Sequence, residues 1–464
     1  MTRLSPLHTA MAVVLALSLG GCAVLRTPYV RPSVVPGPQW KLGPQWKLGQ
    51  GAAEAPTGEA WWRRFGDPQL DRLVDRALAR NNDLAVAAIN LRRAELQARH
   101  AVINPSISGT VTTGSSTALR GPAFSSRTHS ASLLASYEVD LFGALAAQKD
   151  AATWEARATA QDLESARLSL IATTVDDYFL VGYLNNRILL AEQSVSYTRK
   201  ALEVVSIQAR AGAASSLEVA EAGQTLSSQL AGLHDLIQQR VEARSGLDLL
   251  LNGESVAPDD ELQRLPQGAP PAVDAGLPAS LLARRPDLRA RELRLRETLA
   301  DVDRARLSFY PAFSLTGSLG SASATLGNLM RNPIGTAGLD LALPFLQFDQ
   351  VKLAVGVSRA NYEVASLQFR QTLYQGLADV ENALSGREQI AAQVAALEDS
   401  LKNASTVERL DEVRYRAGSI PLQIWLDAQE RRRVAENALA QSRLNRIQNY
   451  VTLSRSLGGD AILP

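Results

Sequence analysis

The side chains that commonly carry enzyme chemistry are scattered through this sequence. Its 464 residues include four histidines, none spaced from another as metal ligands are, at His8, His100, His129 and His234. There is no GxSxG nucleophile motif and no glycine-rich phosphate loop. The carboxylates fall on expected helix faces, where solvation explains them. We therefore expect no enzyme, no metal site and no cofactor.

One thiol remains as a candidate for chemistry. Cys22 is the only cysteine, which excludes a disulfide within the chain. It follows Arg3 and an apolar run from Ala10 to Leu19, which is too short to span a bilayer and is typical of a secretory signal. The alternative is an ordinary signal peptide in which the cysteine has no role.

The residues before this thiol, Leu19-Gly20-Gly21-Cys22, resemble the lipobox of bacterial lipoproteins. The resemblance implies that 1–21 is a cleaved signal and that Cys22 is the acylated first residue. Because Ala23 follows instead of Asp, it also implies sorting to the outer membrane. Two or more acyl chains anchor a protein stably where one does not. Residues 22–60 are then a lipidated N-terminal strap, whose duplicated "GPQWKL" has no assigned function.

Composition favours helices and gives no sign of nucleic-acid binding. The 48 Lys and Arg nearly balance the 47 Asp and Glu, so no net field points to nucleic acid or an acidic substrate. Aromatic residues make up only 5%, and Ala, Leu, Arg, Gln and Glu dominate long blocks.

An internal repeat divides the chain into two similar halves. The triplet Arg210-Ala211-Gly212 recurs as Arg416-Ala417-Gly418, and "PSISGTVTTG" from Pro105 recurs as "PAFSLTGSLG" from Pro311. Both pairs are offset by 206 residues. We predict repeats at 61–252 and 279–458, a connector at 253–278 and a C-terminal tail at 459–464.

Each half contains a stretch in which apolar and polar residues alternate. The pattern predicts one β-hairpin at about 105–141 and another at about 311–347. Each strand has about ten residues, which suffices to cross a bilayer when tilted, with an apolar and a polar face. A half-buried sheet in a soluble domain is the alternative.

Four such strands cannot close a membrane barrel alone. Open edges are not tolerated in lipid, and membrane barrels begin at about eight strands. Several chains must then share one barrel. Three chains giving twelve strands is the natural small solution, although two or four also satisfy the arithmetic.

Very long helices follow each hairpin. Apolar and small residues step by three and four from Leu163 to Ala209, which predicts a helix over about 146–209, roughly 95 Å long. Helices return over about 217–251 and 422–457, after tips at about 210–216 and 416–421. Gly212 and Gly418 are typical helix C-caps. The exposed tips are also candidate docking sites for a partner's helical hairpin.

Four segments carry a family resemblance over nearly the whole mature chain. They are "WWRRFGDPQLDRLVDRALARNNDL" from Trp61, "YEVDLFG" from Tyr137, "LPASLLARRPDL" from Leu277 and "YRAGSIPLQIWLDAQ" from Tyr415. These segments resemble the TolC-like outer-membrane efflux proteins, and most closely the lipoprotein branch that works with resistance-nodulation-division (RND) pumps.

The resemblance implies a mixed α/β membrane protein made mainly of long α-helices. Three chains would form a homotrimer whose α-helical barrel is a periplasmic tunnel, continuous with a shared twelve-stranded β-barrel in the outer membrane. The connector and termini would form an equatorial domain. The implied partners are a periplasmic adaptor (membrane fusion) protein, an inner-membrane RND-type pump and outer-membrane lipid.

The resemblance also implies roles for particular residues. Asp427 occupies the position of an acid that lines the tunnel constriction. Where some relatives carry a second acid, this chain has Gln423, Ile424 and Trp425, so the constriction residues are Asp427, Gln423 and an aromatic contribution from Trp425. Glu218 and Glu221 fall in the equivalent stretch of the first half. They could line the tunnel, or they could equally be solvated charges on a helix surface. The adaptor-docking residues would be the two triplets at the tips.

The expected function is an exit duct that passively conducts small molecules, such as drugs or toxic compounds, from an inner-membrane pump to the exterior. The alternatives are the outer-membrane channel of a type I protein secretion system and a non-conducting helical lipoprotein scaffold. The sequence does not identify the substrate, because a passive duct need not recognise its cargo.

Overall fold

The computed structural model describes residues 26–32, 60–101, 103–120, 125–257, 260–271, 273 and 284–459. The predicted signal, Cys22, most of the strap, part of the connector and nearly all of the C-terminal tail lie outside these residues. Within the described ranges the chain divides into two compact units. One gathers residues 26–32, 89–161 and 288–372, and the other gathers 60–88, 162–287 and 373–459.

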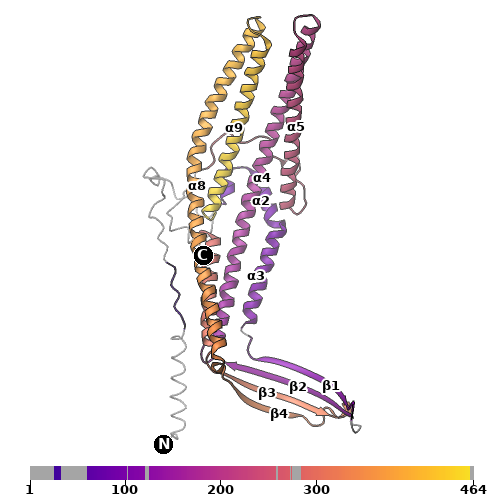
Figure 1. The fold of residues 1–464 in the computed structure, drawn as a ribbon, viewed down its shortest axis with the longest axis vertical. Coiled ribbons are helices and arrows are strands. Elements are labelled where there is room, and N and C mark those ends of the chain that lie inside the picture. The colour runs from indigo at the N-terminus through magenta and orange to yellow at the C-terminus, as the bar shows by residue number, and fades with distance from the viewer. Residues whose placement is uncertain are drawn as a thin grey trace. The chain divides into compact units, whose positions relative to one another are not determined.

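The first unit contains both predicted β-hairpins in one sheet. In the described part of the chain the strands are β1 (Ser106–Thr117), β2 (Ser125–Val139), β3 (Ala312–Ser323) and β4 (Ile334–Ala342). They pair antiparallel in the order β1-β2-β3-β4, with β1 and β4 at the two edges (Figure 1). The sequence pattern placed these strands correctly because alternation and turn residues are local signals.

Strand register gathers the apolar side chains on one face of this sheet. Leu133 lies opposite both Gly109 and Leu319, and Leu315 lies opposite both Tyr137 and Leu339. Leu133 and Leu315 are each 51% exposed, although both are large apolar residues. A register shift of one residue would move the whole set to the other face, so the apolar pattern fixes the pairing.

At the end of the sheet where the strands join the helices, polar side chains form hydrogen bonds with the backbone. Asn104 donates from Nδ2 to the Glu138 carbonyl oxygen (2.7 Å) and accepts from the Glu138 N–H at Oδ1 (3.1 Å). Asp140 then accepts from the backbone N–H groups of Leu145 (3.2 Å) and Ala146 (2.8 Å), which caps the following helix. The segment "YEVDLFG" therefore encodes the passage from strand to helix.

The long helices begin and end close to the predicted positions. They are α4 (Ala144–Arg210), α5 (Ser216–Leu250), α8 (Phe348–Arg416) and α9 (Leu422–Ser456). At 1.5 Å per residue, α4 is roughly 100 Å long. Of the helices in the described ranges, none combines the length and apolarity that crossing a membrane requires.

Shorter helices precede each hairpin of strands. The first half has two of them, α2 (Pro68–Arg80) and α3 (Asn82–His100), and the second half has α7 (Pro286–Leu307). Asn81 separates α2 from α3 with an extended backbone, and its Oδ1 accepts from the Leu84 N–H (3.0 Å). Asp67 caps α2 by accepting from the N–H groups of Gln69 and Leu70.

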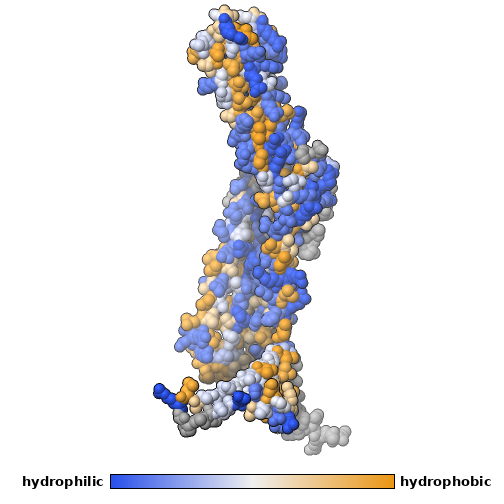
Figure 2. All heavy atoms as spheres, turned by 90° about the vertical axis from the view of Figure 1, so that its right-hand side faces the viewer, coloured by the Kyte–Doolittle hydropathy of each residue, from blue (hydrophilic) through white to orange (hydrophobic). Residues whose placement is uncertain are grey.

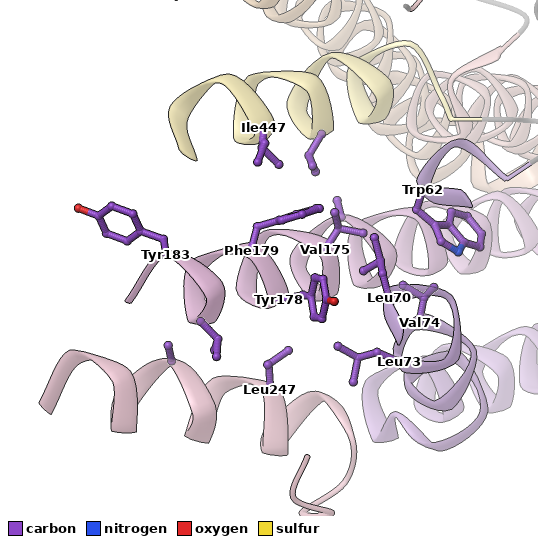
Figure 3. Close-up of a cluster of buried hydrophobic side chains, with 14 of the residues drawn as sticks. Trp62, Leu70, Leu73, Val74, Val175, Tyr178, Phe179, Tyr183, Leu247 and Ile447 are labelled. Atoms are coloured by element: carbon purple, nitrogen blue, oxygen red, sulfur yellow. The ribbon is translucent and has the colours of Figure 1, made fainter. Parts of the chain in front are cut away.

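The second unit has an aromatic core around the start of the first repeat. The 3-10 helix η1 (Trp61–Phe65) packs its Phe65 ring against Phe179 (centroids 4.9 Å apart) and Tyr450 (5.0 Å). Figure 3 shows Phe179 of α4 beside Ile447 of α9, with Leu247 of α5 on the opposite side. The segment "WWRRFGDP" is therefore a packing element that joins α2, α4 and α9.

Candidate functional site: hairpin tips and constriction

Both helical hairpins end their outgoing helix in the same way. At the first tip, residues 210–216, the Gly212 N–H donates to the Ala209 carbonyl (3.0 Å) and the Ala213 N–H donates to the Gln208 carbonyl (2.8 Å). At the second tip, residues 416–421, Gly418 and Ser419 repeat the pattern with Tyr415 and Arg414, both at 2.8 Å. This is the Schellman cap.

The glycine in each cap has a backbone that other residues rarely adopt. Gly212 has φ +74° and Gly418 has φ +70°, and a Cβ atom at either would meet no atom within 4 Å. Backbone conformation therefore selects glycine here, while the space around it is open. Arg210, Ala211, Arg416 and Ala417 are exposed beside these glycines, and Arg416 pairs with Glu412 (2.5 Å).

The returning helices begin differently at the two tips. Ser215 and Glu218 form a capping box at α5: the Ser215 Oγ accepts from the Glu218 N–H (3.3 Å), and Glu218 Oε2 accepts from the Ser215 N–H (2.6 Å). Hydrogen bonds from the Ser215 N–H and hydroxyl lower the pKa of Glu218. Glu218 therefore has a structural role at the first tip.

At the second tip, α9 follows Pro421 without a side-chain cap. The neighbouring Ile420 is buried, with 8% of its surface exposed. Trp425 stacks on Tyr415 of α8 (centroids 5.1 Å apart, planes 23° apart) and meets Tyr197 of α4 edge-on (5.6 Å). Aromatic contacts between helices therefore hold the start of α9.

The structure brings Gln423 and Asp427 together and leaves Trp425 apart from them. Gln423 Nε2 donates to Asp427 Oδ1 (3.2 Å), and both side chains are exposed on one face of α9. Trp425 is half-buried among Tyr197 and Tyr415. Glu221, which the 206-residue offset pairs with Asp427, is likewise exposed. The polar pair can line a space beside α9, whereas Trp425 supports the helix that carries it.

A polar groove of about 800 Å³ lies between the two hairpins. Side chains from α4, α5, α8 and α9 line it. Arg187 donates to the Tyr183 hydroxyl (2.6 Å), which donates to Gln441 Oε1 of α9 (2.7 Å). These bonds connect the first hairpin to the second.

Two adjacent carboxylates on α4 are features that sequence reasoning missed. Burial, with the neighbouring Asp177 charge, raises the pKa of Asp176 to about 7, against a smaller opposing effect of Arg455. Burial raises the pKa of Asp177 to about 6. The available signal was a pair of acids inside the apolar run "IATTVDDYFLVGY". Within the described ranges no group of three or more His, Cys, Asp or Glu is arranged to hold a metal ion.

Comparison with known proteins places the chain among outer-membrane channels. The model of the outer membrane efflux protein family matches residues 73–253 and 277–459. Toxin and drug export protein A of Aggregatibacter actinomycetemcomitans is 29% identical over 97% of both chains. The pyoverdine export outer membrane protein OpmQ of Pseudomonas aeruginosa is 30% identical, with 96% of this chain and 95% of that protein covered.

A solved structure agrees with these sequence relatives. The open state of the Neisseria gonorrhoeae MtrE outer membrane channel superposes with a TM-score of 0.79 at 26% identity, covering 94% of this chain and 98% of that one.

Proposed function

The chain belongs to the outer membrane efflux protein family, and from that premise we propose that three copies assemble into the exit duct of a tripartite efflux pump. The protein is an outer-membrane efflux channel, as are relatives that match it over nearly their full length. Small molecules pass from an inner-membrane RND-type pump and a periplasmic adaptor, through the duct, to the exterior.

The unpaired edges of the sheet are the observation that supports a trimer. Among the described strands, β1 and β4 each pair on one side only, and the sheet presents an apolar face to its surroundings. In lipid an unpaired strand edge costs several kcal/mol per backbone group, so the edges must pair with other copies. Three copies give a closed barrel of twelve strands.

The helical hairpins of the three copies would form the tunnel, with its constriction at the second hairpin. Gln423 and Asp427 share an exposed face of α9 near the second tip, which supports their placement at the narrow end. Three copies of Asp427 would bring like charges together and attract cations. Trp425 acts indirectly, because it holds α9 against α8 and α4.

The two tips are the proposed contact with the adaptor. Small, exposed residues in both triplets let a partner's helices approach the backbone closely. The shared Schellman geometry presents the first and second tips as similar surfaces, so one partner motif can bind both.

We also propose that Cys22 carries a lipid anchor, and the segment that follows it supports this. Thr27 donates from its N–H (2.8 Å) and its hydroxyl (2.6 Å) to the buried Asp303, and Arg31 forms two hydrogen bonds with the buried Glu292. Arg26 pairs with Asp150. These contacts fix the chain to α7 and α4 four residues after the thiol.

Conductance and efflux test the proposed function together. The purified protein should form ion-conducting pores in planar bilayers, and a strain lacking it should retain an efflux dye until the intact gene is restored. A protein that gives no pores and whose loss leaves dye retention unchanged would refute the proposal. Replacement of Cys22 by Ser should abolish palmitate labelling, and unchanged labelling would show that the thiol is not acylated.

A further inference from the structure

Charge is segregated between the two ends of the β-sheet. Residues 106–137 and 312–339, which hold most of the strands and both connecting loops, contain no Asp or Glu. Arginines occur in these stretches at Arg120, Arg127 and Arg331, all at the loop end of the sheet. The carboxylates of Glu138 and Asp340 lie at the opposite end, where the strands join the helices. The loop end is therefore purely cationic.

Strand register places one of these arginines on the apolar face. Side chains two residues apart on a strand share a face, so Arg127 and His129 lie on the side of Leu133 and Tyr137. Toward the loops the partners on this face become polar: Thr113 and Ser323 flank His129, and Ser115 lies opposite Arg127. The apolar band of the sheet therefore ends in a polar row and then an exposed arginine.

The spacing along β2 matches the depth of a membrane. From Val139 to Ala131 the strand rises about 26 Å, close to the roughly 25 Å apolar band of outer-membrane barrels. Arg127 lies about 13 Å farther along the strand. With the apolar band in the hydrocarbon layer, the guanidinium reaches the headgroup layer on the side of the barrel that faces lipid. In Figure 2 the sheet is mostly pale or orange, with few strongly hydrophilic residues.

We propose that Arg127, together with Arg120 and Arg331, binds the phosphate groups of a phosphorylated glycolipid in the outer leaflet. The proposal rests on the proposed function, which directs the loop end outward. A guanidinium holds phosphate through paired N–H donors and keeps its charge at every relevant pH. All three side chains are exposed, and none has an ion pair within the part of the chain that the structure describes. A trimer would carry nine such arginines around its rim.

The test compares phosphorylated and dephosphorylated lipid on the intact trimer. Wild-type trimer in detergent micelles is mixed with diphosphorylated lipid A or with its dephosphorylated form, and native mass spectrometry counts the retained lipids. We expect at least tenfold preference for the phosphorylated form. Arg127→Gln should weaken retention about fivefold, and Arg120→Gln with Arg127→Gln and Arg331→Gln more than twentyfold. Arg92→Gln, which removes an exposed arginine from α3, is the matched control.

Single-channel conductance in phosphatidylcholine bilayers separates the remaining outcomes. All variants should conduct as the wild type does, because the arginines face lipid. Equal retention of both lipids, or unchanged retention in the triple variant, would overturn the proposal. Altered ion selectivity with intact lipid retention would place the arginines in the lumen and also overturn it. A chain that retains phosphorylated lipid but forms no conducting trimer would refute the proposed function and leave the lipid site standing.

Discussion

The two helical hairpins share one cap and differ in everything that follows it. Both outgoing helices end in a Schellman cap at a glycine with positive φ. The first returning helix begins at the polar capping box of Ser215 and Glu218. The second begins at Pro421 and relies on Trp425, which contacts Tyr415 and Tyr197. At an offset of 206 residues, the first hairpin has Ala209 and Val219 where the second has Tyr415 and Trp425.

The start of the first returning helix is therefore fixed by hydrogen bonds within its own hairpin. The start of the second is fixed by aromatic contacts with other helices. A capping box forms between residues three apart and remains intact when the hairpin moves. The aromatic contacts of Trp425 join three helices and must change if α9 moves relative to α4. We infer that the second hairpin is the movable one, and it carries the polar pair of Gln423 and Asp427.

The largest effect on the second hairpin is expected from Trp425→Ala. This change removes two ring contacts that hold α9, at a cost of about 2 kcal/mol for a half-buried aromatic residue. The second hairpin should loosen, so single-channel conductance in planar bilayers should rise and the melting temperature should fall. The matched control is Val219→Ala at the repeat-equivalent position, which should change both quantities less. Equal effects of the two substitutions would contradict the assigned difference between the hairpins.

Bulky substitutions at the tips should weaken adaptor binding without preventing folding. Replacing Gly212 or Gly418 by valine introduces a β-branched side chain at positive φ, with a strain of about 1–2 kcal/mol confined to the tip. We expect cross-linking to the adaptor to fall severalfold while the yield of trimer stays at the wild-type level. Loss of the trimer together with the adaptor would show that the glycines serve only as caps.

Removing the charge of Asp427 should change ion flow. Three carboxylates at a constriction attract cations and would hold a divalent cation in the pore, so Asp427→Ala should raise conductance about twofold when divalent cations are present and lower cation preference. Glu221→Ala, the equivalent change in the first hairpin, should alter both less. Wild-type conductance and selectivity in Asp427→Ala would place the residue away from the constriction.

A further prediction concerns Asp176 of α4, which lies outside both tips and should affect the pH dependence of stability. Its pKa is about 7 in the fold and about 4 in an unfolded chain, so the unfolded state loses its proton first as pH rises. Wild-type stability should therefore fall between about pH 4 and pH 7. Asp176→Asn should unfold at a higher temperature at pH 8, by about 2 kcal/mol of stability, with no difference near pH 4. A variant that is less stable at pH 8 would contradict the raised pKa.

The most local effect is expected at the polar cap of the first tip. Because the pKa of Glu218 is lowered in the fold, the stabilisation by its ionised form is present above the ordinary glutamate pKa and is lost as pH falls through the lowered value. Ser215→Ala should speed hydrogen exchange in the first turn of α5 about fivefold at pH 7. The start of α9, which has no side-chain cap, should lack this acid dependence, and equal acid sensitivity at both tips would count against the distinction.

Local patterns predicted most of the fold from the sequence. Alternation gave the four strands, and the 206-residue repeat gave both hairpins, because these signals are contained in neighbouring residues. Residues 68–100 form two helices, α2 and α3, because the extended backbone at Asn81 ends the first and its side chain caps the second. The break could not be predicted from helical periodicity, because periodicity carries no information on the backbone conformation of a single residue.

The candidate site was less accessible to sequence reasoning. The caps at Gly212 and Gly418 were predictable, since glycine after a helix is a local signal. The partners of Trp425 were not, because Tyr197 lies more than 200 residues earlier and meets it only after the helices pack. The burial of Asp176 was not predictable either, because it too depends on how the helices pack.

Native mass measurement of the detergent-extracted protein tests the central claim most directly. The sheet leaves β1 and β4 with unpaired edges in the described residues, so a barrel in the membrane must be shared between copies. We expect a single species with three times the mass of one mature chain. A stable, folded monomer would contradict the shared barrel, and a dimer or tetramer would contradict its twelve strands.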